Sequence, residues 1–390
     1  MRQYNCKLTD AFRRVDMVLL LFCVVTTTFG CLIIASTTNA SASGPIRDLG
    51  VQIAAAFAGI LAYVFFSSFD TEFFSERRNA LIIFNTVALL MLVPFGTDNG
   101  TGNRSWLNFA FLPFDIQPAE VCKISFVLVM ASVMASRQNN ISSPRSLWLI
   151  FLNMMLVVGL NMLVSRDMGV SLIFVFTTIG MVWAGGVSIL WFLAVGAFGA
   201  LVAPLAWQFI LNDNQRTRIM VLFNPSLDAQ GTGALYHTNR ALRSLTGGGL
   251  TGQGLFQGNR TQTRGALFAQ HTDFIFAAIG EELGFIGCAV VLILLALIIA
   301  RCIWVGNRST DYLRKMVCYG TSAALIFQVV VNIGMCIGVM PVIGLTLPFI
   351  SYGGSSLITL YAMVGLVSGV YARPHPTSHE RYIRPPISHY

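Results

Sequence analysis

The sequence predicts an all-α, polytopic membrane protein with about ten transmembrane helices. Hydrophobic residues make up 55% of the 390 residues and charged residues only 11%, which is too little charge for a water-soluble surface. Apolar runs close to the roughly 20 residues needed to cross a bilayer recur along the chain. The net charge of +8 comes largely from basic residues in the short connections between these runs. This charge therefore indicates membrane topology rather than nucleic-acid binding.

The predicted spans are separated by connections of very different length. Most connections are short, whereas two external ones, 96–118 and 212–271, are long enough to carry function. We predict one transmembrane domain over residues 1–373 with a long extracellular loop at 212–273, and a disordered cytoplasmic tail at 374–390. The spans are approximately 18–35, 51–69, 80–95, 119–135, 147–164, 168–185, 187–211, 274–300, 317–339 and 355–371.

The basic residues predict the orientation of the chain. With ten crossings and the N-terminus inside, arginines and lysines of the short loops fall on the cytoplasmic side, as the positive-inside rule requires. Both termini are then cytoplasmic. The long loop also carries arginines, but it is near the length at which charge stops controlling orientation, so these residues need another reason.

The cysteines give no sign of a metal site. All eight are scattered singly, mostly within or beside the spans, and none forms a CxxC or other metal-ligand spacing. We interpret them as packing residues and expect no metal-ligand cluster.

Ionisable residues at membrane depth are costly and so are candidates for function. Glu120 and Lys123 lie three apart, which puts them on one helical face as an ion pair that is either structural or functional. Asp167, beside Arg166, is either an N-cap or a cavity residue. Glu281 and Glu282 point about 100° apart on a helix, so at least one faces protein interior.

A second group lies where the long loop enters the eighth span. Asp273 follows His271 and Thr272 there, and its carboxylate could act as general base on a sugar hydroxyl while arginines neutralise a phosphate leaving group. On position alone, a helix cap at Thr272 or Asp273 is an equal alternative. The glycine-rich segment at 247–254 is a flexible turn or a phosphate cradle, but it lacks the GKS or GKT of a P-loop.

Five motifs in the same order resemble the SEDS family, the FtsW and RodA proteins of bacterial wall synthesis. The longest is HTDFIFAAIGEELGFIG at residues 271–287. It is preceded by RSW at 104–106, QPAEVCK at 117–123, and QRTR at 215–218 with NP at 224–225. It is followed by GLTLPFISYGGSS at 344–356. The family pattern departs at Ala119 and at three other short elements, 166–170, 235–240 and 267–270, which could alter substrate contacts.

This resemblance implies a SEDS-like ten-helix fold and a peptidoglycan glycosyltransferase that polymerises lipid II at the outer face of the bacterial cytoplasmic membrane. It assigns Asp273 as the catalytic base and undecaprenyl pyrophosphate as the leaving group. We expect Arg216 and Arg218 to contact the pyrophosphate. The other expected substrate-binding residues are His271, Thr272, Glu120, Lys123, Asp167, Glu281, Ser351 and Tyr352.

The resemblance also implies no required cofactor, although a divalent cation such as Mg²⁺ could assist at the pyrophosphate. The expected partner is a class B penicillin-binding protein that cross-links the glycan strands. Family members serve elongation, division or sporulation. A lipid II flippase and a non-enzymatic scaffold for the penicillin-binding protein are the alternative functions. A flippase requires polar groups along a complete path across the bilayer, whereas the ionisable residues here cluster toward the external half, and a scaffold does not need an acid at position 273.

Overall fold

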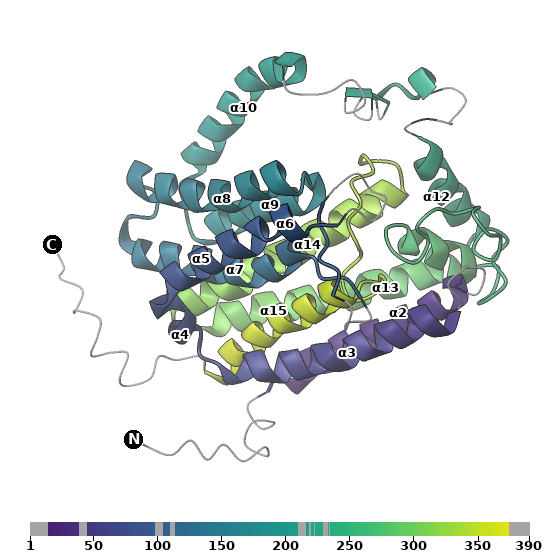
Figure 1. Ribbon diagram of the computed structural model, residues 1–390, viewed down its shortest axis with the longest axis horizontal. Helices are drawn as coiled ribbons and strands as arrows, with labels where there is room; N and C mark the ends of the chain where they lie inside the picture. The colour runs from purple at the N-terminus through teal and green to yellow at the C-terminus, as the bar shows by residue number, and fades with distance from the viewer. Residues whose placement is uncertain are drawn as a thin grey trace.

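The structure is a bundle of membrane-length helices (Figure 1). This computed structural model describes residues 15–38, 45–97, 104–109, 114–209, 216–217, 220–221, 223–228, 233 and 235–373. Within these ranges no strand forms, and two isolated bridges join Thr97 to Trp106 and Leu107 to Ile116. The prediction of an all-α polytopic membrane protein is confirmed. The predicted tail at 374–390 lies outside the described residues.

Eight helices of the described chain are long and apolar enough to cross a membrane, and two shorter apolar helices, α9 and α10, accompany them. The predicted total of ten crossings stays a prediction. The helices are α2 (Met17–Thr38), α3 (Pro45–Ser68), α4 (Thr71–Glu76), α5 (Arg78–Leu90), α6 (Leu92–Phe95), α7 (Pro118–Ser136), α8 (Pro144–Val164), α9 (Met168–Ala184), α10 (Ile189–Phe209), α12 (Tyr236–Gly247), α13 (Ile275–Arg308), α14 (Tyr312–Cys336) and α15 (Gly354–Ala372).

Local sequence explains where several helices begin. Proline occupies the start of α7 and α8, where its missing N–H costs no hydrogen bond. The side chains of Ser143 and Asp311 cap α8 and α14 by accepting backbone N–H groups of the first turn. The breaks between spans are thus encoded by caps and prolines as well as by loss of hydrophobicity.

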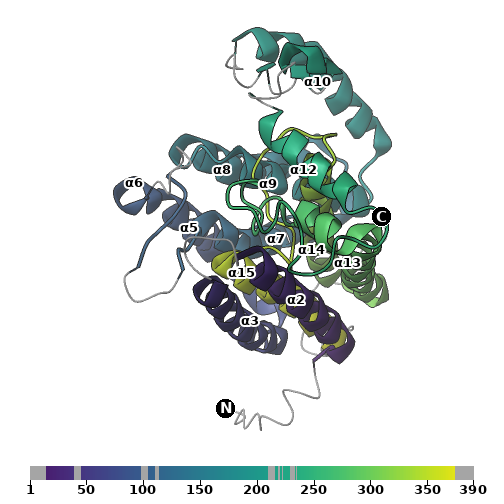
Figure 2. The ribbon, with the colours of Figure 1, turned by 90° about the vertical axis from the view of Figure 1, so that its right-hand side faces the viewer.

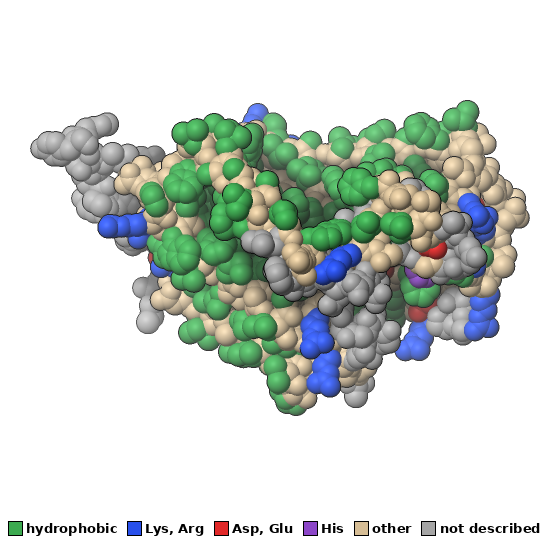
Figure 3. Space-filling model, turned by 90° about the horizontal axis from the view of Figure 1, so that it is seen from above, with side chains coloured by type: hydrophobic (Ala, Val, Ile, Leu, Met, Phe, Trp, Pro, Cys, Tyr) green, Lys and Arg blue, Asp and Glu red, His purple; other side chains and the backbone are tan. Residues whose placement is uncertain are grey.

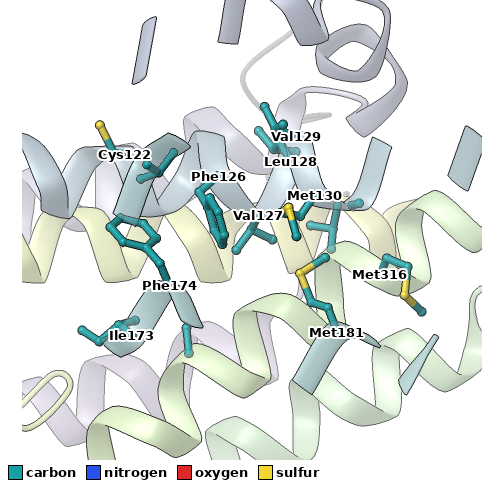
Figure 4. Packing of buried hydrophobic residues seen from close by; sticks show 14 of the residues in the cluster. Cys122, Phe126, Val127, Leu128, Val129, Met130, Ile173, Phe174, Met181 and Met316 are labelled. Atoms are coloured by element: carbon teal, nitrogen blue, oxygen red, sulfur yellow. The ribbon is translucent and has the colours of Figure 1, made fainter. Parts of the chain in front are cut away.

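The centre of the bundle is formed by α7, α14 and α15, most of whose residues are buried on all sides. Between α7 and α9, the rings of Phe126 and Phe174 meet edge to face at 4.9 Å, with Met181 nearby (Figure 4). Glycine permits close contact between α15 and α3, because a Cβ on Gly365 would lie 2.6 Å from the carbonyl oxygen of Tyr63. Close packing of this kind holds the helices that surround the site.

Hydrophobic side chains cover much of the outer surface, as expected for helices that face lipid (Figure 3). Exposed examples include Phe57, Leu163 and Leu201. The helix α10 stands apart from the rest of the bundle in both ribbon views (Figures 1 and 2).

The first and last described residues lie at the same end of the bundle. The N–H of Asp16 donates to Ser368 Oγ at 2.9 Å, and the Tyr63 hydroxyl donates to the Asp16 carbonyl at 2.8 Å. Arg301, near the far end of α13, forms two bonds of 2.9 and 3.1 Å with the Asp16 carboxylate. The N-terminus of α13, with Asp273 just before it, therefore lies at the opposite end.

The helix α13 is interrupted near its start, and the glycine-rich segment at 247–254 supplies hydrogen-bond partners at the interruption. Gly284 has φ 65° and ψ −162°, values that interrupt helical hydrogen bonding. The N–H of Phe285 donates instead to the Gly249 carbonyl at 2.9 Å, and the N–H of Gly254 donates to the Glu282 carbonyl at 2.9 Å. A Cβ on Gly252 would lie 2.2 Å from that same Glu282 oxygen. The segment is thus a packed backbone contact and neither of the two expected forms, a flexible turn or a phosphate cradle.

Candidate active site

A cavity of about 760 Å³ opens at the end of the bundle where α13 begins. Its walls come from residues far apart in the sequence: the first external connection, the starts of α7 and α9, the segment before α13, and the segment from 342 to 356. Three aromatic residues, Trp106, Phe114 and Tyr352, line it together with acids and amides. A pocket with apolar walls and a few convergent polar groups is typical of a small-molecule site.

Asp273 lines this cavity with a carboxylate that has no hydrogen bond or cationic partner in the described part of the chain. Its backbone is fixed, because Asn332 Nδ2 donates to the Asp273 carbonyl at 2.8 Å and to the Leu345 carbonyl at 2.6 Å. The N-cap of α13 is Phe274, and no side chain caps this helix. The alternative of a helix cap at Thr272 or Asp273 is therefore wrong, and the carboxylate stays available to a ligand.

Gly344 keeps the space beside this carboxylate open. Its φ of +79° is a left-handed conformation that side chains rarely adopt, and a Cβ there would lie 3.6 Å from Asp273 Oδ2. A side chain at this position would therefore be in contact with the carboxylate.

The expected residues Ser351, Tyr352, His271 and Thr272 join two segments of the site. Ser351 Oγ donates to the Thr272 carbonyl at 2.6 Å, and the N–H of Tyr352 donates to the His271 carbonyl at 2.8 Å. The rings of His271 and Tyr352 lie 5.6 Å apart. Thr272 and Tyr352 line the cavity, whereas His271 and Ser351 do not, so the latter pair positions the walls.

Asp167 combines its two expected roles. It accepts the N–H of Val170 at 3.1 Å as the N-cap of α9, and it also lines the cavity. Its second carboxylate oxygen accepts Gln117 Nε2 at 2.8 Å. The preceding residue, Arg166, has φ 56°, which turns the chain sharply between α8 and α9.

Glu120 lines the cavity and forms a 2.7 Å ion pair with Lys123, as their spacing predicts. Lys123 does not line the cavity, and its side chain is only 2% exposed. An ion pair of this kind offsets the cost of burying both charges. Only the carboxylate of the pair can contact a ligand directly.

Two more expected substrate contacts, Glu281 and Arg216, do not line the cavity, and a third lies outside the described residues. Glu281 is fully buried and accepts the backbone N–H of Arg260 at 2.5 Å, so it holds the loop that packs on α13. Arg216 donates to the Gln208 carbonyl at 2.9 Å and does not line the cavity. Arg218 lies outside the described residues.

Burial and like charge shift the ionisation of the site. Burial, and then the negative charge of Asp167, raise the pKa of Asp273 to about 6. Burial also raises the pKa of Asp167, against the lowering effect of the Val170 N–H. The pKa of His271 is lowered by burial, so its imidazole is neutral at pH 7. Asp273 is thus ionised at neutral pH yet close enough to its pKa to accept a proton.

Some lining residues were not predicted. Arg47 lies in the first turn of α3, Gln328 lies within the apolar run of α14, and Ser355 lies in the first turn of α15. A polar Gln inside a membrane span is a signal that could have been noticed. Within the described residues, no group of three His, Cys, Asp or Glu side chains could hold a metal ion.

Comparisons with known proteins agree with this architecture. Over 361 residues the chain is 32% identical to "Peptidoglycan glycosyltransferase MrdB" of Escherichia coli (strain K12), covering 91% of this chain and 93% of that one. It is 34% identical over 296 residues to "Probable peptidoglycan glycosyltransferase FtsW" of Haemophilus influenzae, covering 75% and 73% of the two chains.

Two solved structures share the fold. One, described as "Structural coordination of polymerization and crosslinking by a peptidoglycan synthase complex", matches with a TM-score of 0.77 and 28% identity over 93% of this chain and 99% of that chain. The rod shape determining protein RodA of Thermus thermophilus matches with a TM-score of 0.65 and 25% identity, covering 93% and 98%. The family described as "Cell cycle protein", which comprises FtsW, RodA and SpoVE, matches residues 16–374. The chain therefore belongs to the FtsW/RodA/SpoVE family.

Proposed function

We propose that this chain is a peptidoglycan glycosyltransferase that polymerises lipid II, with Asp273 as the general base. The observation that carries the proposal is a carboxylate that has no cationic partner among the described residues and lines a cavity at one end of a membrane bundle. The printed names of the relatives, peptidoglycan glycosyltransferases, support the reaction class.

In the proposed reaction Asp273 accepts the proton of the acceptor sugar hydroxyl. The hydroxyl oxygen bonds to the anomeric carbon of the donor sugar, and the bond from that carbon to undecaprenyl pyrophosphate breaks. General-base catalysis of this kind contributes about 10²- to 10⁴-fold to a rate. A divalent cation such as Mg²⁺ would be held mainly by the pyrophosphate and water, because Mg²⁺ uses few protein ligands.

The site faces outward from the bacterial cytoplasmic membrane in this proposal. Arg77, Arg308 and Arg373 lie near the end of the bundle that holds the first and last described residues. The positive-inside rule assigns this end to the cytoplasm. The cavity lies at the opposite end, where lipid-linked sugars meet the wall.

A class B penicillin-binding protein is the proposed partner. The support is the similarity to a chain from a complex that couples polymerization and crosslinking. The partner would supply the transpeptidase that cross-links the glycan strands.

The test is polymerisation of lipid II by purified full-length protein, with and without the partner. Asp273→Asn should lower the rate by about 10²- to 10⁴-fold, because the amide cannot accept the proton. Asp228→Asn, an acid in the external segment but away from the cavity, is the matched control and should keep the parent rate.

Glycan strands formed by Asp273→Asn at the parent rate would remove the base from the mechanism. If the parent protein forms no strands but moves lipid II across vesicles, the chain is a flippase. If it does neither and still recruits the partner, it is a scaffold.

A further inference from the structure

Four helices begin at the cavity. Gln117 and Glu120 of α7, Asp167 at the start of α9, Asp273 before α13, and residues 353–356 of α15 all line it. The first turn of a helix has N–H groups without helical partners and carries a partial positive charge. The cavity therefore collects the positive ends of four helix dipoles.

Three of these helices carry an acid at that end, and α15 does not. Glu120 lies in the first turn of α7, Asp167 caps α9, and Asp273 immediately precedes the N-cap of α13. The N-cap of α15 is Gly353, which makes no side-chain capping bond, and its first turn has no acidic residue. The first α15 hydrogen bond runs from Leu357 N–H to the Gly353 carbonyl at 2.9 Å. The intervening N–H groups, 354–356, have no acceptor in the described chain.

A second observation at this end also points to a ligand. Ser355 lines the cavity and is only 7% exposed, yet its hydroxyl has no hydrogen bond to any described residue. The hydroxyl of the neighbouring Ser356, which also lines the cavity, is buried without a partner. Buried hydroxyls are nearly always hydrogen-bonded, so the buried Ser356 hydroxyl, together with the Ser355 hydroxyl at the cavity wall and three N–H groups that have no acceptor in the described chain, indicates a missing acceptor.

The surrounding residues suit an anion of several oxygens. Gly354, which lines the cavity, packs so closely on Phe114 that a Cβ would lie 2.6 Å from that ring, so only glycine fits at this first residue of α15. Arg47 lines the same cavity and adds a full positive charge. Backbone N–H groups, hydroxyls and one guanidinium are the donors that bind phosphate at helix N-termini.

We propose that residues 354–356 at the start of α15, with Arg47, bind the pyrophosphate of the lipid-linked donor. This rests on the proposed function and names the place of its leaving group. As the carbon–oxygen bond breaks, its electron pair stays on the pyrophosphate oxygen, and the α15 N–H groups and Arg47 stabilise that charge. The hydrogen bonds from Ser351 to Thr272 and from Tyr352 to His271 set this anion site beside Asp273.

The test measures equilibrium binding of undecaprenyl pyrophosphate and of inorganic pyrophosphate to purified full-length protein. Ser355→Asp places a carboxylate at the helix start, where it stabilises α15 but repels phosphate, so the Kd of both probes should rise at least about tenfold. Ser355→Ala should raise it by a smaller factor, and Arg47→Gln should raise it several-fold. These variants should also raise the KM for lipid II.

The matched controls are Ser226→Asp and Arg264→Gln, exposed residues of the external segments that do not line the cavity. Their Kd values should equal the parent value. Parent affinity in both Ser355 variants would overturn the anion site, while the proposed function would stand if Asp273→Asn still abolishes polymerisation. Loss of undecaprenyl pyrophosphate binding with unchanged binding of inorganic pyrophosphate would also overturn it, because the lipid tail would then be the group affected.

Discussion

The aspartates at the two ends of the bundle differ in their partners, although Glu120 at the cavity end is paired with Lys123. At the end assigned to the cytoplasm, Asp16 is paired with Arg301 and Asp70 with Arg314, each through two hydrogen bonds. At the cavity end, Asp273 has no cationic partner among the described residues, and Asp167 accepts only N–H groups and an amide. Paired acids hold helices together, whereas an unpaired acid in a cavity can exchange a proton. We therefore expect the ion pairs at the cytoplasmic end to stabilise the fold and Asp273 at the cavity end to take part in the reaction.

The largest effect on stability is expected at the paired end. Arg301→Met leaves the Asp16 carboxylate, which is only 1% exposed, without its cation, and such a loss costs about 3–5 kcal/mol. Thermal unfolding in detergent should show a large fall in Tm, while the polymerisation rate per folded molecule should stay at the parent value.

The double variant Asp16→Leu with Arg301→Met supplies the control. It removes both charges, so it should recover much of the lost stability. A rate per folded molecule that falls in Arg301→Met as far as in Asp273→Asn would contradict the division between the two ends.

The space beside the Asp273 carboxylate, at the cavity end, can be tested with two glycine variants. Gly344→Ala and Gly186→Ala replace glycines with φ of +79° and +81°. Backbone strain should therefore lower the free energy of unfolding of both variants by about 1–2 kcal/mol. Only a methyl at 344 would contact the Asp273 carboxylate, since nothing lies within 4 Å of a Cβ at 186. The polymerisation rate should fall about tenfold in Gly344→Ala alone, measured beside the Tm of each variant. Equal rates in the two variants would show that the space beside the acid does not matter.

The sequence was sufficient for the fold class because hydropathy acts locally. Apolar length predicts a span without knowledge of its neighbours, while the orientation from arginine placement stays a prediction. The break in α13 at Gly284 could not be predicted in this way. It depends on backbone contacts with residues 249–254. The sequence of a glycine run does not show whether the run is exposed to solvent or packed against a helix.

The site was predictable only in part, for a related reason. Asp167 and Glu120 were identifiable because a charge at membrane depth is costly and so needs a purpose, whereas Asp273 was identified from its place at the end of the long loop and from the family motif. Arg47 and Ser355 carry no such signal, since an arginine beside a span and a serine at a helix start are ordinary. Their meaning appears only when α3 and α15 bring them to one cavity.

The smallest effect is a shift in pH dependence, and it concerns the interaction between Asp273 and Asp167, neither of which has a cationic partner among the described residues. A base with a raised pKa is active above that pKa and is lost as pH falls through it, so the polymerisation rate should decline below about pH 6. Asp167→Asn removes a negative charge that raises the pKa of Asp273, and Asn still caps α9. The acidic limb of the kcat/KM profile should therefore move to lower pH by up to about one unit. Asp115→Asn removes another acid of the cavity that is not among the groups raising the pKa of Asp273, so its profile should match the parent. An acidic limb that stays in place in Asp167→Asn would mean that burial alone sets the ionisation of Asp273.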